Sequence, residues 1–256
     1  MRLIGMVHLP ALPGSPRWDG SIDHAIDVAL TDARALVDNG MDALIVENYG
    51  DAPFTRGRVA ASTVAAMAVV ARELRRALPD TPLGVNMLKC DARSALGVAA
   101  AVGARFIRVN VLAGAVVADQ GIVETDAYEL LRERRLLGVE VAIFADVQGK
   151  HAVPLAPVEL EQQARDLASR SLADGLVVSG RATGDATPLG DVKRVRSAVP
   201  DVPILVGSGV TAETAAELLS IADALIVGTS LKRDGDVSNP VDPARVRRLV
   251  DAVGGR

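Results

Sequence analysis

The chain has 256 residues, a length that suits a single barrel of eight strand–helix units. Hydrophobic residues make up 49% of it but only six residues are aromatic, so the core must be built from Val, Ile, Leu and Ala. The formal net charge of −4 is spread without long runs of one sign, which argues against a surface for nucleic acid or an anionic membrane. We therefore expect no nucleic-acid partner.

The amino-terminal segment and the cysteine content indicate a cytoplasmic protein. Met1 to His8 is apolar for too short a stretch to form a secretion signal or a membrane span, and turn residues follow it at once. We interpret it as a buried first strand and expect no transmembrane segment. Cys90 is the only cysteine, so no intrachain disulfide can form, which suits a reduced cytoplasm.

Short apolar runs recur along the chain with helix-length segments between them, a pattern typical of a parallel sheet. The runs do not alternate with polar residues, so both faces of each predicted strand are expected to be buried. Eight such runs are present: Leu3 to Val7, Ala43 to Val46, Leu83 to Val85, Phe106 to Val109, Val141 to Ala145, Gly175 to Val178, Ile204 to Val206, and Ala224 to Val227.

The segments between these runs carry helix signals. An apolar stripe from Ile22 to Val37 follows Ser21, a plausible N-cap, and stops before Gly40. Thr211 and Pro243 mark the starts of two later helices. No linker or composition shift divides the chain, so residues 1–256 are predicted to form one α/β domain. Eight consecutive parallel units favour a closed (β/α)₈ TIM barrel over an open doubly wound sheet.

Polar residues follow almost every predicted strand on the same side, where the chemistry of such barrels gathers. For each Asn alone, a plain turn role is as good an explanation as a functional one. The candidates are His8, Glu47, Asn48, Asn86, Asn110, Asp146, Ser179, Gly180, Gly207, Ser208, Gly209, Gly228, Thr229 and Ser230.

The last two strand ends predict a phosphate site. Gly207-Ser208-Gly209 and Gly228-Thr229-Ser230 supply backbone amides able to surround a phosphate, and a short helix is expected to begin within Ser230 to Lys232. Ser179 to Gly184 is a third glycine-containing loop beside them. The alternative is that these glycines only serve tight turns.

Two carboxylates, Glu47 and Asp146, directly follow apolar runs, where a charge must be solvated, paired or functional. We expect them to act as base and acid over a common cavity, with His8 or Lys150 stabilising developing negative charge and His151 nearby. A structural or solvated role is the alternative for His8 and His151. His24, inside the first predicted helix, is interpreted as structural.

The sequence requires no cofactor. Glu47, Asp146 and His151 are side chains able to bind a divalent metal, although their spacing fits no compact ligand motif. Cys90 shows no sign of thiolate activation and is interpreted as inert. Val111 to Glu124 is long for a loop of this architecture and is expected to form a lid.

Ordered motifs are spread along almost the whole chain, and they include residues 4–10, 12–16, 46–54, 84–86, 106–110, 119–121, 145–147, 150–152, 207–209 and 226–232. Together these segments resemble the BtpA/SgcQ family. The resemblance implies a phosphate-binding barrel similar to phosphoribosylanthranilate isomerase and ribulose-phosphate epimerase. One branch of the family is named for photosystem I accumulation, and another is associated with sugar-uptake gene clusters.

Two hypotheses follow. The first is an enzyme that isomerises, epimerises, cleaves or hydrolyses a phosphorylated sugar or a related small phosphate ester. The second is a non-catalytic assembly or scaffold factor that has kept the barrel. By analogy with other such barrels, a homo-oligomer is expected in either case.

Overall fold

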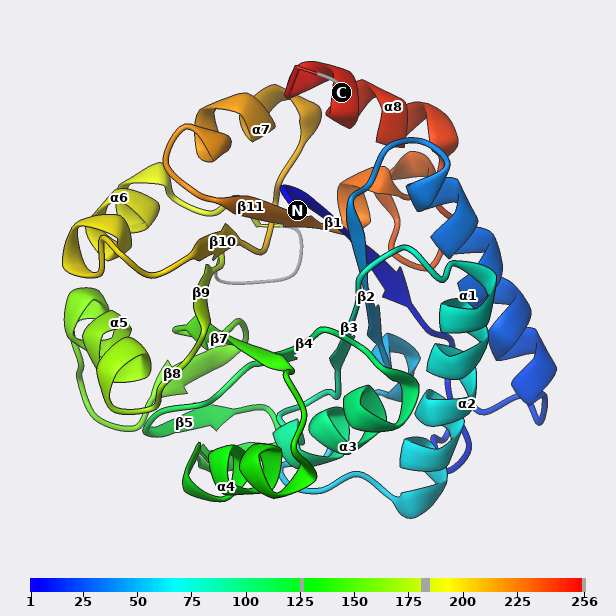
Figure 1. Cartoon of the computed structure of the whole chain (residues 1–256), viewed down its shortest axis with the longest axis horizontal. Helices are drawn as coiled ribbons and strands as arrows, with labels where there is room; N and C mark the ends of the chain where they lie inside the picture. Colours follow the sequence, from blue (N-terminus) through cyan, green and yellow to red (C-terminus); the bar gives the residue numbers. More distant parts are fainter. Residues whose placement is uncertain (125–126, 181–184, 255–256) are drawn as a thin grey trace.

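A closed barrel of eight parallel strands forms the centre of the molecule (Figure 1). The computed structural model describes residues 1–124, 127–180 and 185–254. Around the barrel the strand order is β1-β11-β10-β9-β7-β4-β3-β2. The predicted TIM barrel is thus confirmed. The barrel strands are β1 (Leu3–His8), β2 (Ala43–Glu47), β3 (Leu83–Asn86), β4 (Phe106–Val109), β7 (Ala142–Val147), β9 (Gly175–Val178), β10 (Ile204–Val206) and β11 (Ala224–Val227).

Helices surround the strands as an outer ring (Figure 1). In the described residues they are α1 (Ile22–Val37), α2 (Ala61–Ala77), α3 (Ala92–Val102), α4 (Ala127–Leu137), α5 (Leu160–Ser169), α6 (Leu189–Ala198), α7 (Ala212–Leu219) and α8 (Pro243–Ala252). The predicted start signals are confirmed, because the Ser21 hydroxyl accepts the His24 amide at 3.1 Å and a capping box at Thr211 opens α7. Among the described residues, no helix is long and apolar enough to cross a membrane.

Side chains that alternate along the strands fill the barrel interior. They form a cluster separate from the larger core between strands and helices, and its members are Ile4, Met6, Ala43, Ile45, Phe106, Phe144, Val177, Leu205, Ala224 and Ile226. Gly84 makes room for one large ring, since a Cβ there would lie 2.2 Å from Phe106. The interior is therefore a packed core, as expected for eight strands.

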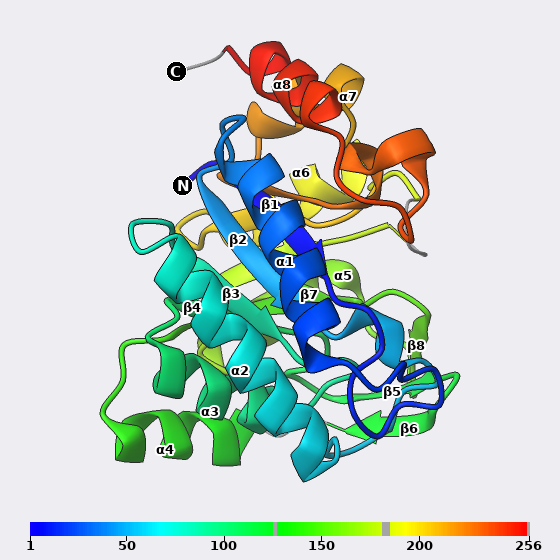
Figure 2. The ribbon, with the colours of Figure 1, turned by 90° about the vertical axis from the view of Figure 1, so that its right-hand side faces the viewer.

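The predicted lid segment is not an irregular loop, so that part of the prediction is wrong. It contains strands β5 (Ala115–Ala118) and β6 (Gly121–Glu124), and β5 also pairs with β8 (Ala152–Pro154) in a small antiparallel sheet. The cause is a hairpin signal: Gly121, with φ of +104°, follows the turn, and alternating Val116 and Val123 face inward. The small sheet lies on the same side of the barrel as the loop after β1 (Figure 2).

Short 3₁₀ turns complete the connections on this side. They are η1 (Tyr49–Asp51), η2 (Thr229–Leu231) and η3 (Arg233–Gly235). The short helix expected within Ser230 to Lys232 is thus a single 3₁₀ turn that begins one residue earlier. Of the third glycine-containing loop, residues 181–184 lie outside the described residues.

Candidate active site at the carboxyl ends of the strands

The uppermost interior layer of the barrel is polar. Two residues beyond the apolar interior positions, the same alternation reaches His8, Glu47, Asn86, Arg108, Asp146, Ser179, Gly207 and Gly228. His8 lies in register with Glu47, and Glu47 with Asn86. These residues cover the end of the apolar core. We call this layer the polar floor of the barrel.

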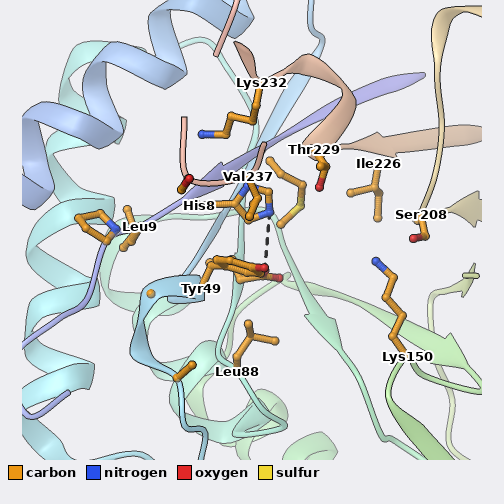
Figure 3. A pocket seen from close by; sticks show the side chains of 18 of the residues that line it. His8, Leu9, Tyr49, Leu88, Lys150, Ser208, Ile226, Thr229, Lys232 and Val237 are labelled. Carbon is orange, nitrogen blue, oxygen red and sulfur yellow. Dashed lines mark ion pairs between the residues drawn. The ribbon is translucent and has the colours of Figure 1, made fainter. Parts of the chain in front are cut away.

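A cavity of about 1160 Å³ opens above this floor (Figure 3). Of the predicted site residues, those that line it are His8, Glu47, Asn110, Lys150, His151, Gly207, Ser208, Gly209, Gly228, Thr229 and Ser230. The cavity lining does not include Asn48, Asn86, Asp146, Ser179 or Gly180. Most of the strand ends singled out from the sequence therefore meet at one place, and the others support it from behind.

Glu47 is buried beside His8, with 3.9 Å between its Oε1 atom and the imidazole Nε2 (dashed line in Figure 3). Asn86 donates to its Oε2 atom at 2.7 Å. Burial raises the pKa of the Glu47 carboxyl, although Arg108, Lys150 and the Asn86 hydrogen bond act in the opposite direction. The result is a carboxylate whose affinity for a proton is increased and whose position is fixed.

His8 is neutral at physiological pH. Burial, followed by the ammonium of Lys232, lowers its pKa to about 3. The contact with Glu47 is therefore not a pair of full charges. The Nδ1 atom of His8 is buried and has no hydrogen-bond partner within the described part of the chain.

Arg108 and Asp146 form a buried ion pair in the same floor. The guanidinium donates through Nε to Oδ1 at 2.8 Å and through Nη2 to Oδ2 at 3.0 Å, and Asn110 donates to Oδ2 at 3.0 Å. The Asp146 side chain has no exposed surface, whereas Arg108 lines the cavity. Asp146 thus holds Arg108 and Asn110, which do face the cavity.

Sequence reasoning gave Arg108 no role, although a signal was present. In Phe106-Ile107-Arg108-Val109 the charge stands two residues after a Phe that fills the barrel, so it must also point inward. A guanidinium in that position requires a carboxylate from a neighbouring strand, and β7, which pairs with β4, provides Asp146.

Lys150 reaches the cavity from the segment after β7 and points toward Ser208 (Figure 3). It is half-buried, and within the described residues no hydrogen bond or ion pair holds its ammonium group. Burial, and next the guanidinium of Arg108, lower its pKa to about 8. A cation in this state is suited to bind an anion or to give up a proton.

The loops after β10 and β11 are tied together. The Ser230 hydroxyl donates to the Val210 carbonyl at 2.6 Å, and the Thr187 hydroxyl donates to the Ser208 carbonyl at 3.0 Å. A Cβ at Gly209 would lie 2.3 Å from the Asp185 carbonyl oxygen, and one at Gly228 would lie 2.7 Å from the His8 ring. These glycines allow close approach, which suits both the phosphate prediction and the alternative of tight turns.

Asn48 holds two neighbouring loops together. Its Oδ1 accepts the Leu88 amide at 2.6 Å, while its Nδ2 donates to Asp51 at 2.9 Å and to the Leu88 carbonyl at 3.3 Å. Gly180 packs in a similar way, because a Cβ there would lie 2.4 Å from the Asp185 carbonyl oxygen. Ser179 accepts a weak hydrogen bond from Arg108 at 3.4 Å. The structure places all three behind the cavity.

The remaining histidines lie toward the rim. His151 is exposed and has a positive φ of 53°, and His24 lies 2.5 Å from Asp19. Lys232, which sequence reasoning also missed, is buried in an ion pair with Asp32, so the segment after β11 is fastened to α1. Among the described residues no group of three or more His, Cys, Asp or Glu side chains could hold a metal ion.

Comparison with known proteins gives one family match and several relatives. The model described as the BtpA family matches residues 1–255. The Photosystem I biogenesis protein BtpA of Synechocystis sp. is 44% identical over 98% of this chain and 87% of its own length. An uncharacterized protein of Thermococcus kodakarensis is 46% identical over 97% of this chain and 94% of its own length.

Solved structures with the same architecture are much less similar in sequence. Phosphoribosyl anthranilate isomerase from Thermus thermophilus has a TM-score of 0.60 at 16% identity and covers 99% of this chain and 98% of its own. A native KDPGal structure has a TM-score of 0.60 at 13% identity and covers 98% and 94%. At such identities the likeness establishes the barrel fold and leaves the reaction open.

Proposed function

We propose that this chain, which belongs to the BtpA family, is an enzyme that acts on a small phosphate ester. The phosphate binds at the loops after β10 and β11, with the backbone amides of Gly207-Ser208-Gly209 and Gly228-Thr229-Ser230 around it. Glu47 and Lys150 then act on the part of the substrate that lies above the polar floor of the barrel.

One observation carries the proposal. Lys150 is half-buried and held by no ion pair in the described residues, and it points at Ser208 in one of the glycine loops (Figure 3). An unpaired buried ammonium costs free energy unless a ligand anion or a proton transfer gives it a role. In the described part of the chain, the buried Nδ1 of His8, Oδ1 of Asn110 and side-chain amide of Gln120 have no hydrogen-bond partner. These three residues line the cavity, which supports a polar ligand there.

The chemistry that fits is proton transfer. The pKa of Glu47 is raised and that of Lys150 is lowered, so the two pKa values move toward neutral pH from opposite sides. In the proposed step the Glu47 carboxylate removes a proton from a substrate carbon, and the Lys150 ammonium donates to the oxygen on which the negative charge develops. Isomerases, epimerases and lyases share this step. Asp146 is assigned a positioning role, through Arg108 and Asn110.

Activity screening tests the proposal. A panel of pentose and hexose phosphates, with and without divalent metals, should contain a substrate whose turnover is abolished in Glu47→Gln while the variant stays folded. Glu140→Gln is the matched control, because Glu140 is exposed and precedes β7 at the opposite end of the barrel. Full activity in Glu47→Gln would refute the assignment of Glu47 as the base.

The pH profile gives a second reading of the same proposal. Activity should rise as Glu47 ionises above its usual range and fall as Lys150 loses its proton near its pKa of about 8. Lys150→Arg should move the alkaline limb to higher pH, because a guanidinium stays protonated. An unchanged alkaline limb in this variant would exclude Lys150 as the acid.

An assembly or scaffold function is the second candidate, because the Synechocystis relative is named a photosystem I biogenesis protein. Exposed apolar side chains on the small sheet also favour a protein partner: Val117 pairs with both Ile122 and Val153, and all three are exposed. A tight protein partner that is lost in Val117→Asp, together with no turnover on any phosphate ester, would favour this candidate.

A further inference from the structure

The cavity has two ends of different chemistry. Lys150 and Ser208 lie at one end, and Leu9, Tyr49 and Leu88 lie toward the other, where the Tyr49 ring packs against His8 with 5.0 Å between the ring centroids (Figure 3). Its volume of about 1160 Å³ exceeds the range of about 300–1,000 Å³ that holds a drug-sized ligand. A sugar phosphate bound at the first end would leave the second end unused.

Two of the chain's aromatic side chains line this cavity. The chain has only six, and Phe106 and Phe144 fill the barrel interior. Of the remaining four, Tyr49 and Phe54 both line this cavity, and both come from the segment after β2. Aromatic and aliphatic side chains together form a surface suited to a flat apolar group.

Hydrogen bonds and close packing hold this apolar end in place. The Asp51 carboxylate in η1 accepts a hydrogen bond from the Leu12 backbone amide at 2.7 Å. Gly50 packs so closely that a Cβ there would lie 2.3 Å from the Ala11 nitrogen. Asn48 fixes Leu88 through two hydrogen bonds, as described above. A wall held this way loses little conformational entropy on binding, which favours affinity.

The two ends of the cavity also differ in whether their lysine side chains form ion pairs. Lys232 is paired with Asp32, and Lys89 lies 3.5 Å from Asp119. Lys150 is the lysine of the lining for which the described residues supply no ion pair. An anionic group is therefore favoured at the Lys150 end, and an uncharged group at the Tyr49 end.

We propose that the substrate is a phosphate ester that also carries a planar, largely apolar ring, bound among Tyr49, Phe54 and Leu88. This inference rests on the proposed function and deepens it by naming the substrate class. The reacting atoms of such a molecule lie between its phosphate and its ring, above His8 and Glu47 and on the side of Lys150, which serves as the acid and also attracts the anionic substrate.

Calorimetric titration of the full chain with matched probes tests the inference. The probes are ribose 5-phosphate, which has no planar aromatic ring; adenosine 5′-monophosphate and benzyl phosphate, two phosphate esters that carry such a ring; and adenosine, which lacks the phosphate. At least one ring-bearing ester should bind about tenfold more tightly than ribose 5-phosphate, since ring stacking and burial supply about 1.4 kcal/mol, the equivalent of that factor. Adenosine alone should bind much more weakly than its monophosphate.

Variants at the two tyrosines locate the ring. Tyr49→Ala should remove most of the tenfold gain without changing the affinity for ribose 5-phosphate, and Tyr49→Phe should retain it. Tyr128→Ala is the control, because Tyr128 is exposed on α4 and does not line the cavity. Since the chain has two tyrosines, fluorotyrosine labelling gives two signals, and only that of Tyr49 should shift with a ring-bearing ester.

The titration results distinguish a failure of this inference from a failure of the proposed function. Binding of ribose 5-phosphate with no gain from either ring would overturn the inference and leave the proposed function intact. No binding by any phosphate ester would overturn both. Adenosine binding as tightly as adenosine 5′-monophosphate, or a gain that survives in Tyr49→Ala, would overturn the arrangement of phosphate and ring.

Discussion

Glu47 is placed in a barrel interior that disfavours its charge, and this makes a prediction about stability. Its folded-state pKa is raised, so its contribution to stability is present below the unfolded pKa and is lost as pH rises through the folded pKa. Glu47→Gln cannot ionise and still offers an oxygen to Asn86. The variant should therefore be more stable than the native chain at neutral pH, by about 0.5–2 kcal/mol, which is typical of such replacements.

Urea denaturation at several pH values measures this difference. The advantage of Glu47→Gln should shrink as pH falls toward the ordinary range of a glutamate. Equal stability of the two proteins at neutral pH would mean that the site does not disfavour the charge of Glu47, and the argument for an active-site base would lose its physical support.

Replacement of Asp146 in the Arg108–Asp146 pair should lower the stability of the chain, in contrast to replacement of Glu47. Asp146→Asn leaves a buried guanidinium without its counter-charge, so we expect a loss of about 3–5 kcal/mol in the free energy of unfolding. The double variant Arg108→Met with Asp146→Leu should regain much of that loss, because no uncompensated charge remains. Denaturation of the three proteins checks this, and a stable Asp146→Asn without turnover would instead restore Asp146 as the acid.

Residue roles were harder to predict than residue locations. The strand ends drew attention to Glu47 and Asp146 alike, yet one faces the cavity and the other is paired behind it. That difference depends on the partner strand, because β4 supplies Arg108 across the ladder and the sequence does not show which strands are neighbours. Asn48 illustrates the same limit, since its contacts to Leu88 join two loops forty positions apart.

At the scale of helices and strands, the periodic patterns of apolar residues were the main basis of the predictions. The eight apolar runs became the barrel strands, but four of these strands extend past the run to include a polar residue, such as His8 in β1 and Asp146 in β7. The alternation of side chains explains the extension, because the next inward position follows two residues later. The β5–β6 hairpin was missed because its short strands were taken for one long connection.

The loop after β10 provides a prediction at this scale. Gly209 has a φ of +59°, and a Cβ there would lie 2.3 Å from the Asp185 carbonyl oxygen. Gly209→Val should therefore cost about 1–3 kcal/mol in backbone strain alone and should weaken phosphate binding. Gly57→Val is the control, since Gly57 has open space around its Cβ position. Thermal unfolding and phosphate titration check both, and unchanged phosphate affinity in a folded Gly209→Val would remove this loop from the site.

Over the whole molecule, the net charge and the cavity charge differ in sign. The chain carries −4, whereas five lysines and arginines line the cavity against three aspartates and glutamates in the described residues. A cavity with excess positive charge inside an acidic protein favours anions locally, and the effect weakens with added salt. Self-association, expected by analogy with other barrels, stays a prediction that measurement of the mass in solution would check.

The proposed phosphate loops predict that a bound phosphate ester raises the stability of the folded chain. This prediction does not depend on which reaction takes place. A ligand that binds only the folded state at about 100 times its dissociation constant adds about 2.7 kcal/mol of stability. For a domain of this size each kcal/mol raises Tm by about 2–4 °C, so the correct phosphate ester should raise it by about 5–10 °C. The unphosphorylated compound should raise it much less, because backbone amides and Lys150 interact most strongly with an anion.

Two variants make the thermal shift specific. Gly209→Val should remove the difference between the phosphorylated and unphosphorylated compounds. Cys90→Ser should preserve it, because the Cys90 thiol donates to the Val111 carbonyl at 3.2 Å, a contact that a hydroxyl can also make. If no phosphate ester of the panel shifts the Tm of the native chain, at millimolar concentration and low salt, the phosphate site loses its main support. A scaffold function, as the name of the Synechocystis relative suggests, would then explain the molecule better.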